Sequence, residues 1–220
     1  MDRRITLNGA AFFNDFKNII LTATSCDDIS PFPSAPCFAP RNMGNAHVKG
    51  FELETQARPI SGLQLDGALS YLDFKYTTTN FAATGIPITA QPPYSPKWKW
   101  SFGVQYRFDL GDNGSITPRI DGTYQSSVFS DANNSPAGVD PAVVATAPNA
   151  NSNKISGYAL FNGRVTWRNP TGDLQVAMEV TNLGNKLFYL TQWFAPFTAG
   201  AVGAQPGMPR EWLMTVKKSF

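Results

Sequence analysis

The chain has 220 residues and a formal net charge of +2, with 42% hydrophobic, 13% aromatic and only 15% charged residues. An average soluble domain has about a quarter charged residues, and the scattered Lys and Arg residues indicate no nucleic-acid-binding patch. No apolar stretch reaches the roughly 18 residues that a membrane-spanning helix requires, so no helical span is expected.

Eight segments show the alternation of apolar and polar residues that predicts β-strands. The clearest runs from 97 to 110, where every second residue is apolar, beginning at Trp98 and ending at Leu110. A strand of that length is much longer than the average of about 5–6 residues. With aromatic residues at both ends, it is typical of a tilted strand that crosses a bilayer between two aromatic girdles. In chain order, the expected strands are 4–20, 46–59, 63–78, 97–110, 115–128, 157–168, 173–185 and 209–220.

The connections between these segments alternate in length without exception. Long loops are expected at 21–45, 79–96, 129–156 and 186–208, and tight turns at 59–62, 111–114 and 169–173. Outer-membrane barrels have short periplasmic turns and long extracellular loops. We therefore predict an all-β fold of antiparallel, up-and-down transmembrane β-barrel strands in a bacterial outer membrane. No second domain is expected, and Phe220 is placed at the periplasmic rim.

Charged residues on the polar parity of the strands are expected to face the lumen, since a charge facing lipid at mid-bilayer costs roughly 2–4 kcal/mol. They could form a ligand path or docking wall, or simply pair with one another in water. The set comprises Glu52, Glu54, Arg58, Asp66, Lys97, Lys99, Arg107, Asp109, Arg119, Asp121, Arg164, Glu179, Glu211 and Lys217.

Few residues suggest a specific chemistry. Cys26 and Cys37 lie in one loop, and an even pair so close in sequence is typical of a disulfide in an exported protein, although two unrelated thiols would also fit. His47, the single histidine, could serve a barrel-borne hydrolase site or simply lie at the rim. The sequence has no phosphate-binding loop and no nucleophile-elbow motif. We therefore expect no enzyme, no catalytic residue, no metal site and no cofactor.

The last long loop is rich in aromatic residues, namely Phe188, Tyr189, Trp193, Phe194 and Phe197. Exposed aromatic side chains on an outer loop could contact a ligand, and Trp193, Phe194 and Phe197 are our candidates for that role. They could equally form the upper interfacial girdle or pack against other loops.

Short motifs occur along the whole chain. The segment 45–54 reads N-x-x-x-x-G-x-E-x-E and resembles a strand of TonB-dependent outer-membrane receptors, whose order of motifs the chain also follows, and 62–73 is similar to the strand that comes next in that family. The segment 93–97 resembles the P-x-x-P entry to the next strand. The segment 180–186 is similar to the signature v-x-N-L-f-d-k of the penultimate strand, and 206–210 to the G-x-P-R entry to the last one.

The resemblance also covers the end of the chain. Phe220 matches the aromatic residue that closes the family's insertion signal, which the barrel assembly machinery recognises. Lys218 stands where that signal usually has an aromatic or apolar residue, so we expect the machinery to recognise the signal more weakly or through neighbouring residues. Gly184 stands where an aromatic residue is common, which is a smaller departure.

The resemblance implies a receptor that imports a scarce nutrient, such as a ferric siderophore, a cobalamin or a glycan, across the outer membrane. Such receptors have a plug domain, a TonB box and a barrel of about 22 strands. Eight strands without a plug resemble the C-terminal third of such a barrel, so we expect residues 1–220 to be an incomplete barrel that is not active alone. The implied partners are outer-membrane lipid, the barrel assembly machinery, the remaining strands and plug, and TonB through the plug segment that these residues lack.

Two other functions stay open at this point. The eight strands could close into a complete small barrel that acts as an anchor or adhesin, because closure leaves no unpaired strand edge in lipid. Alternatively, the chain could be a barrel hydrolase that uses His47.

Overall fold

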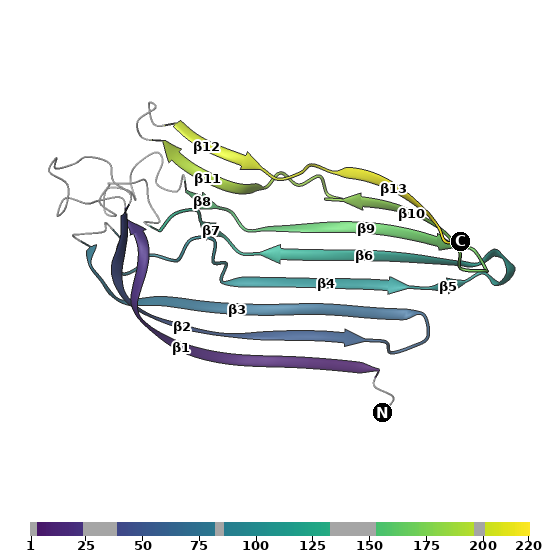
Figure 1. The fold of residues 1–220 in the computed structure, drawn as a ribbon, viewed down its shortest axis with the longest axis horizontal. Helices are drawn as coiled ribbons and strands as arrows, with labels where there is room; N and C mark the ends of the chain where they lie inside the picture. Colours follow the sequence, from purple (N-terminus) through teal and green to yellow (C-terminus); the bar gives the residue numbers. More distant parts are fainter. Residues whose placement is uncertain (1–3, 24–38, 82–85, 133–152, 196–200) are drawn as a thin grey trace.

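The computed structural model describes residues 4–23, 39–81, 86–132, 153–195 and 201–220, and nearly all regular structure in these ranges is β-strand. Figure 1 shows one long antiparallel sheet with two short ladders at its loop end. No helix in the described ranges is long and apolar enough to cross a membrane. The main strands are β1 (Ile5–Ala23), β2 (Ala39–Ala57), β3 (Leu63–Thr79), β4 (Trp98–Tyr106), β6 (Ser115–Gln125), β9 (Tyr158–Arg168), β10 (Leu174–Thr181) and β13 (Glu211–Lys218).

The smaller elements lie off this path. β5 pairs with β6 at the turn end of the sheet, and a single 3₁₀ turn, η1, follows it. At the loop end, β7 pairs with β8, and β11 pairs with β12. Their bounds are β5 (Phe108–Asp109), η1 (Gly111–Asn113), β7 (Val128–Phe129), β8 (Lys154–Ile155), β11 (Tyr189–Ala195) and β12 (Ala201–Pro206).

The main strands form a meander, because each pairs antiparallel with the next main strand along the chain. The eight predicted strands and their up-and-down order are therefore confirmed. β1 and β13 lie at opposite edges of the sheet (Figure 1), and within the described residues each pairs on one side only. The sheet is therefore open rather than closed on itself.

The first connection is shorter than the sequence predicts. β1 and β2 stay paired as far as Ala23 and Ala39, beyond the expected strand ends. The register shifts after Phe16, where Asn18 adopts a φ of 57°. Across this bulge, the Asn18 backbone N–H donates to the side-chain oxygen of Asn45 (3.1 Å). A bulge interrupts the two-residue period, which is why the sequence pattern ended the first strand too early and began the second too late.

The last long connection also contains more regular structure than predicted. β11 and β12 form an antiparallel ladder inside the range 186–208, which was expected to be a loop. Trp193 on β11 lies opposite Gly203 on β12, and a Cβ atom on Gly203 would lie 2.2 Å from the indole ring. The missing side chain at Gly203 therefore lets the indole pack against the backbone of the ladder.

Residues that lie opposite one another on neighbouring strands form rows across the sheet, and successive rows alternate between its two faces. Apolar residues gather in the rows of one face and polar residues in those of the other, so the main sheet has one apolar and one polar face. One row on the apolar face contains Leu65, Val104, Ile120, Gly163, Val180 and Trp212. Large side chains on this face are well exposed even on interior strands, among them Ile120 (41%), Val165 (50%) and Met178 (56%). A soluble sheet would cover such a face with a second layer, whereas a membrane barrel turns it to lipid. We therefore take the apolar face as the membrane-facing surface.

Aromatic side chains mark two levels on the apolar face. At the loop end, the ring centroid of Tyr71 lies 4.5 Å from that of Trp98 and 5.8 Å from that of Phe51. We call these three residues the upper girdle. At the turn end, the ring centroids of Tyr106 and Phe108 are 4.6 Å apart. Aromatic belts of this kind lie at membrane–water interfaces, so the bilayer lies between these two levels.

Candidate functional site on the polar face

The polar face centres on Arg119 of β6. Its guanidinium group donates to both carboxylate oxygens of Asp66 on β3 (3.0 and 3.2 Å) and to both of Asp121 on its own strand (2.6 to 3.0 Å). It also donates to the side-chain oxygen of Gln105 on β4 (3.3 Å), whose amide donates to Gln64 (3.3 Å). Bidentate Arg–carboxylate bonds are among the strong hydrogen bonds in proteins. A single side chain thus joins three strands on this face.

Gly103 on β4 makes room for this cluster. It lies in the row between Asp66 and Asp121. A Cβ atom at this position would come within 2.1 Å of an Arg119 guanidinium nitrogen and 2.5 Å of an Asp66 carboxylate oxygen. The guanidinium group therefore occupies space that any other side chain would fill. Sequence reasoning placed the three charged residues on the lumen face but missed the role of Gly103, whose signal was a glycine on the polar parity of a strand.

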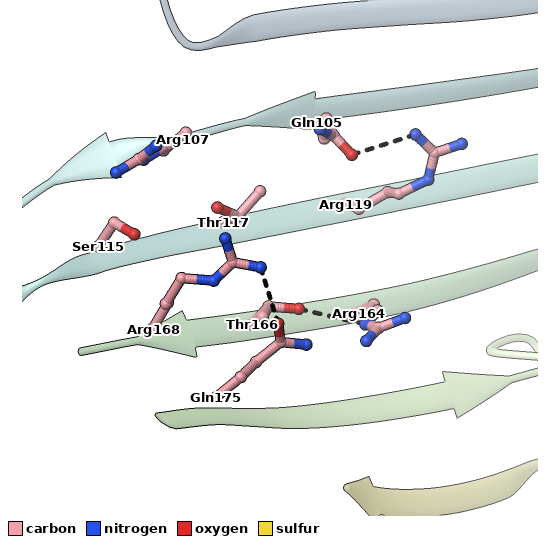
Figure 2. A pocket seen from close by; sticks show the side chains of 9 residues that line it. All are labelled: Gln105, Arg107, Ser115, Thr117, Arg119, Arg164, Thr166, Arg168 and Gln175. Atoms are coloured by element: carbon pink, nitrogen blue, oxygen red, sulfur yellow. Dashed lines mark hydrogen bonds between the residues drawn. The ribbon is translucent and has the colours of Figure 1, made fainter. Parts of the chain in front are cut away.

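Four arginines line a shallow hollow of about 280 Å³ beside this cluster, towards the tight turns (Figure 2). We call it the basic hollow. Arg164 lies 3.9 Å from Glu179, whereas Arg168 donates only to a neutral amide, that of Gln175 (3.0 Å). Among the described residues, neither Arg107 nor Arg168 has an ion pair with a carboxylate. The hollow is lined by Gln105, Arg107, Ser115, Thr117, Arg119, Arg164, Thr166, Arg168 and Gln175.

This arrangement has a clear chemical consequence. The basic hollow has more positive than negative charge, and guanidinium groups match the geometry of carboxylates and phosphates. The hollow can therefore hold an anionic group that enters from the lumen side. Its lining holds only amides, hydroxyls and guanidinium groups. In the described ranges, no group of three or more His, Cys, Asp or Glu side chains could hold a metal ion.

His47 lies on the opposite face from the Arg119 cluster. Its Nε2 atom is 3.4 Å from the Asp15 carboxylate, and its ring centroid is 5.2 Å from that of Phe13. The side chains of His47 and Asp15 are each 48% exposed. Within the part of the chain that the structure describes, no serine hydroxyl bonds to His47. The structure therefore places His47 beside the membrane-facing surface and not in a lumen site.

The prediction that Lys97 faces the lumen was wrong. Its Nζ atom lies 3.9 Å from the Asp73 carboxylate and 5.5 Å from the centre of the Tyr71 ring, on the apolar face. β4 begins at Trp98. Lys97 therefore precedes the strand, and its side chain does not follow the strand's alternation.

Some predicted site residues lie outside the described ranges, namely Cys26, Cys37 and Phe197. The disulfide between Cys26 and Cys37 and the ligand contact of Phe197 therefore stay predictions. Trp193 is described, and 51% of its surface is exposed. Phe194 lies on the same strand, β11, and a ligand contact by its side chain also stays a prediction.

The end of the chain is fastened to the last tight turn. Lys218 bonds to the carboxylate of Asp173, the Thr171 hydroxyl bonds to the same carboxylate, and the Asn169 amide donates to it (2.7 Å). The Lys218 ammonium, helped by Thr171 and then Asn169, holds the pKa of Asp173 well below its usual value. Phe220 lies beyond β13 and is fully exposed. The residue that departs from the insertion signal, Lys218, thus anchors the edge strand to the neighbouring turn.

Comparisons with known proteins agree with this architecture. A family model described as "TonB dependent receptor-like, beta-barrel" matches residues 1–183. The chain is similar to the ferric yersiniabactin uptake receptor FyuA from Yersinia pestis, with 18% identity and a TM-score of 0.72, over 100% of this chain and 28% of that one. It is also similar to the siderophore receptor PiuA from Acinetobacter baumannii, with 16% identity and a TM-score of 0.65, over 99% of this chain and 26% of that one.

A third similar structure is the ferric-catecholate import receptor Fiu from E. coli K12 in its closed form, with 17% identity and a TM-score of 0.63, over 100% of this chain and 26% of that one. Identities this low show a shared fold alone. The chain spans between 26% and 28% of the length of these three receptors.

A Gly103→Ala substitution is expected to destabilise the folded protein by about 1–3 kcal/mol, because the added methyl group displaces Arg119 and leaves charged hydrogen bonds unmade. Urea unfolding of the detergent-solubilised protein measures this change. Gly67→Ala on β3 is the matched control, because a Cβ atom there meets only ordinary contacts of 3.4 and 3.5 Å. Equal stability of the two variants would contradict the role assigned to Gly103.

An Asp173→Asn substitution is expected to lower the thermal stability of the protein at neutral pH by a few degrees. A lowered carboxyl pKa stabilises the folded state above the ordinary Asp pKa of about 4, and that contribution is lost as the pH falls through the lowered value. The two proteins should therefore differ at pH 7 and converge in strong acid. Heat-modifiable migration on gels at several pH values measures this, with Asp112→Asn in η1 as the control. A pH-independent difference would rule out the ion pair as its cause.

Proposed function

Because this chain belongs to the TonB-dependent receptor-like β-barrel family, we propose that it forms part of the wall of a receptor that imports a ferric siderophore. Proteins of this family lie in the outer membrane of Gram-negative bacteria, and so does this chain. The observation that carries the proposal is the two-faced meander, which has lipid-facing aromatic girdles on one side and the Arg119 cluster on the other.

The open sheet supports a larger assembly. Backbone N–H and C=O groups at an unpaired strand edge cost several kcal/mol each in lipid, so spanning sheets close into barrels. Among the described residues, β1 and β13 are both such edges. We propose that residues 1–220 form the C-terminal portion of a barrel of about 22 strands, without the plug domain. A closed eight-stranded barrel would require β1 to meet β13, and these strands lie at opposite margins of the sheet in Figure 1.

The polar face fits the inner wall of that barrel. We assign the basic hollow to contacts with carboxylates of the plug domain that fills the lumen of the complete receptor. Arg107 and Arg168 are suited to this because their charges are not balanced within the described residues. TonB would act on the plug and not on this wall. Phe220, exposed at the end of β13, would be read by the barrel assembly machinery.

The substrate proposal rests on the named receptors of the same fold. FyuA, PiuA and Fiu are receptors for ferric yersiniabactin, a siderophore and a ferric catecholate. This favours a ferric siderophore over a cobalamin or a glycan. The outer loops would bind it, and among them Trp193 on β11 offers an exposed aromatic surface at the loop end. Phe194 and Phe197 are proposed to extend this surface.

Uptake by the bacterium that produces the protein tests this proposal. Deletion of the gene should abolish the uptake of one ⁵⁵Fe-loaded siderophore in iron-poor medium and leave cobalamin uptake unchanged. In the same assay, Trp193→Ala should weaken siderophore binding about tenfold, as loss of an aromatic hot spot does. Leu190→Ala is the control, because Leu190 is a comparably exposed apolar residue (49%) on the same strand. Unchanged uptake of every siderophore tested, or loss of cobalamin uptake instead, would contradict the proposal.

A further inference from the structure

A group of lysines lies just beyond the upper girdle, on the membrane-facing side of the sheet. In the register of β1, β2 and β3, one row contains Ala11, Phe51 and Tyr71, and the next row towards the loops contains Phe13, Lys49 and Asp73. The row after that contains Asp15, His47 and Lys75. The apolar face thus changes from aromatic to charged within a single row, at the level where the bilayer interface is expected.

Three lysines share one carboxylate in this region. The Nζ atoms of Lys49, Lys75 and Lys97 lie 3.8, 3.7 and 3.9 Å from the carboxylate oxygens of Asp73. The Asp73 side chain is only 12% exposed, whereas the lysines are 58%, 72% and 54% exposed. We call these four residues the lysine cluster.

The charges in the lysine cluster do not balance. Three ammonium groups surround one carboxylate, which leaves an excess of two positive charges. Asp15, an acid in the same row as Lys75, contacts His47 at 3.4 Å. Lys97 also lies over the Tyr71 ring, 5.5 Å from its centre, which holds its ammonium group beside the upper girdle. Like charges this close repel one another, so the arrangement favours an anion that approaches from outside.

We propose that the lysine cluster binds the phosphorylated headgroup of a glycolipid in the outer leaflet of the outer membrane. Lysine binds phosphate as a point charge, and clusters of basic residues at a membrane interface attract anionic headgroups. A lipid placed here has its phosphates level with the ammonium groups, and its acyl chains run down the apolar face past the upper girdle.

The location favours a lipid over a free phosphate ion or a lumen ligand. The lysine cluster lies on the face opposite the Arg119 cluster, since Asp73 shares its parity with Tyr71 and Asp66 does not. A ligand in the lumen therefore cannot reach it. The aromatic rings directly beneath it supply an apolar surface that an inorganic ion would not use. This inference goes beyond the proposed transport function and does not depend on the identity of the imported nutrient.

Binding of purified lipid A that carries two phosphates tests the proposal, with the protein extracted from outer membranes, stripped of bound lipid and held in a neutral detergent. Native mass spectrometry over a lipid titration gives the affinity. Changing Lys49, Lys75 and Lys97 together to Gln should weaken binding at least about tenfold, because each basic residue near a headgroup surface contributes measurably. Lipid A freed of its phosphates should bind the unchanged protein as weakly as diphosphorylated lipid A binds this variant.

The matched control changes Lys154, Lys186 and Lys217 to Gln, which removes the same charge elsewhere. This variant should bind lipid A like the unchanged protein, and heat-modifiable migration should show both variants folded. Equal binding by the two variants would overturn the proposal, as would displacement of the lipid by millimolar inorganic phosphate, which would mark a free-ion site. If the triple variant does not fold, the single substitution Lys75→Gln takes its place in the lipid A titration, because Lys75 is the most exposed of the three lysines. This variant should also bind lipid A more weakly than the unchanged protein.

Discussion

The structure depends on one constraint, namely that every backbone N–H and C=O group in lipid needs a hydrogen-bonding partner. The eight main strands satisfy it by antiparallel pairing with the next strand along the chain. Within the described part of the main sheet, two rows of backbone groups are left unpaired, on β1 and β13, and these open edges are the strongest physical argument for further strands beside them. The long and short connections, the two-residue alternation and the aromatic girdles all follow from strands that cross a bilayer and turn back.

With the backbone paired, the side chains are free to differ between the two faces. The apolar face leaves Ile120, Val165 and Met178 exposed on interior strands, and a lipid environment makes such exposure favourable. On the polar face, the guanidinium group of Arg119 bonds to side chains of three strands, and Gly103 gives it the space. The basic hollow and the lysine cluster then place unbalanced positive charge on opposite faces, one towards the lumen and one towards the lipid headgroups.

Much of this fold could be predicted from the sequence, because successive residues of a strand face opposite sides of the sheet, so their alternation is visible in a short stretch of sequence. The alternation from Trp98 onwards located β4 and its lipid-facing side correctly. The two-residue alternation gave wrong predictions where the local geometry changed. It misplaced the strand ends at the Asn18 bulge, and it assigned the wrong face to Lys97, which precedes β4. The sites were harder to predict, since they are made across strands. Arg119 and Asp66 are 53 residues apart, and only the register brings them together.

The central claim, that one face of this sheet meets lipid and the other meets the aqueous lumen, can be measured along β6. Single nitroxide labels would be placed at consecutive positions from Ile116 to Tyr124, in the membrane-embedded protein with Cys26 and Cys37 replaced. Collisions with dissolved oxygen, which concentrates in lipid, should be frequent at Ile116 and Ile120 and rare at Thr117 and Thr123. Collisions with a water-soluble nickel chelate should show the opposite pattern. Accessibility that does not alternate with a period of two would contradict the account.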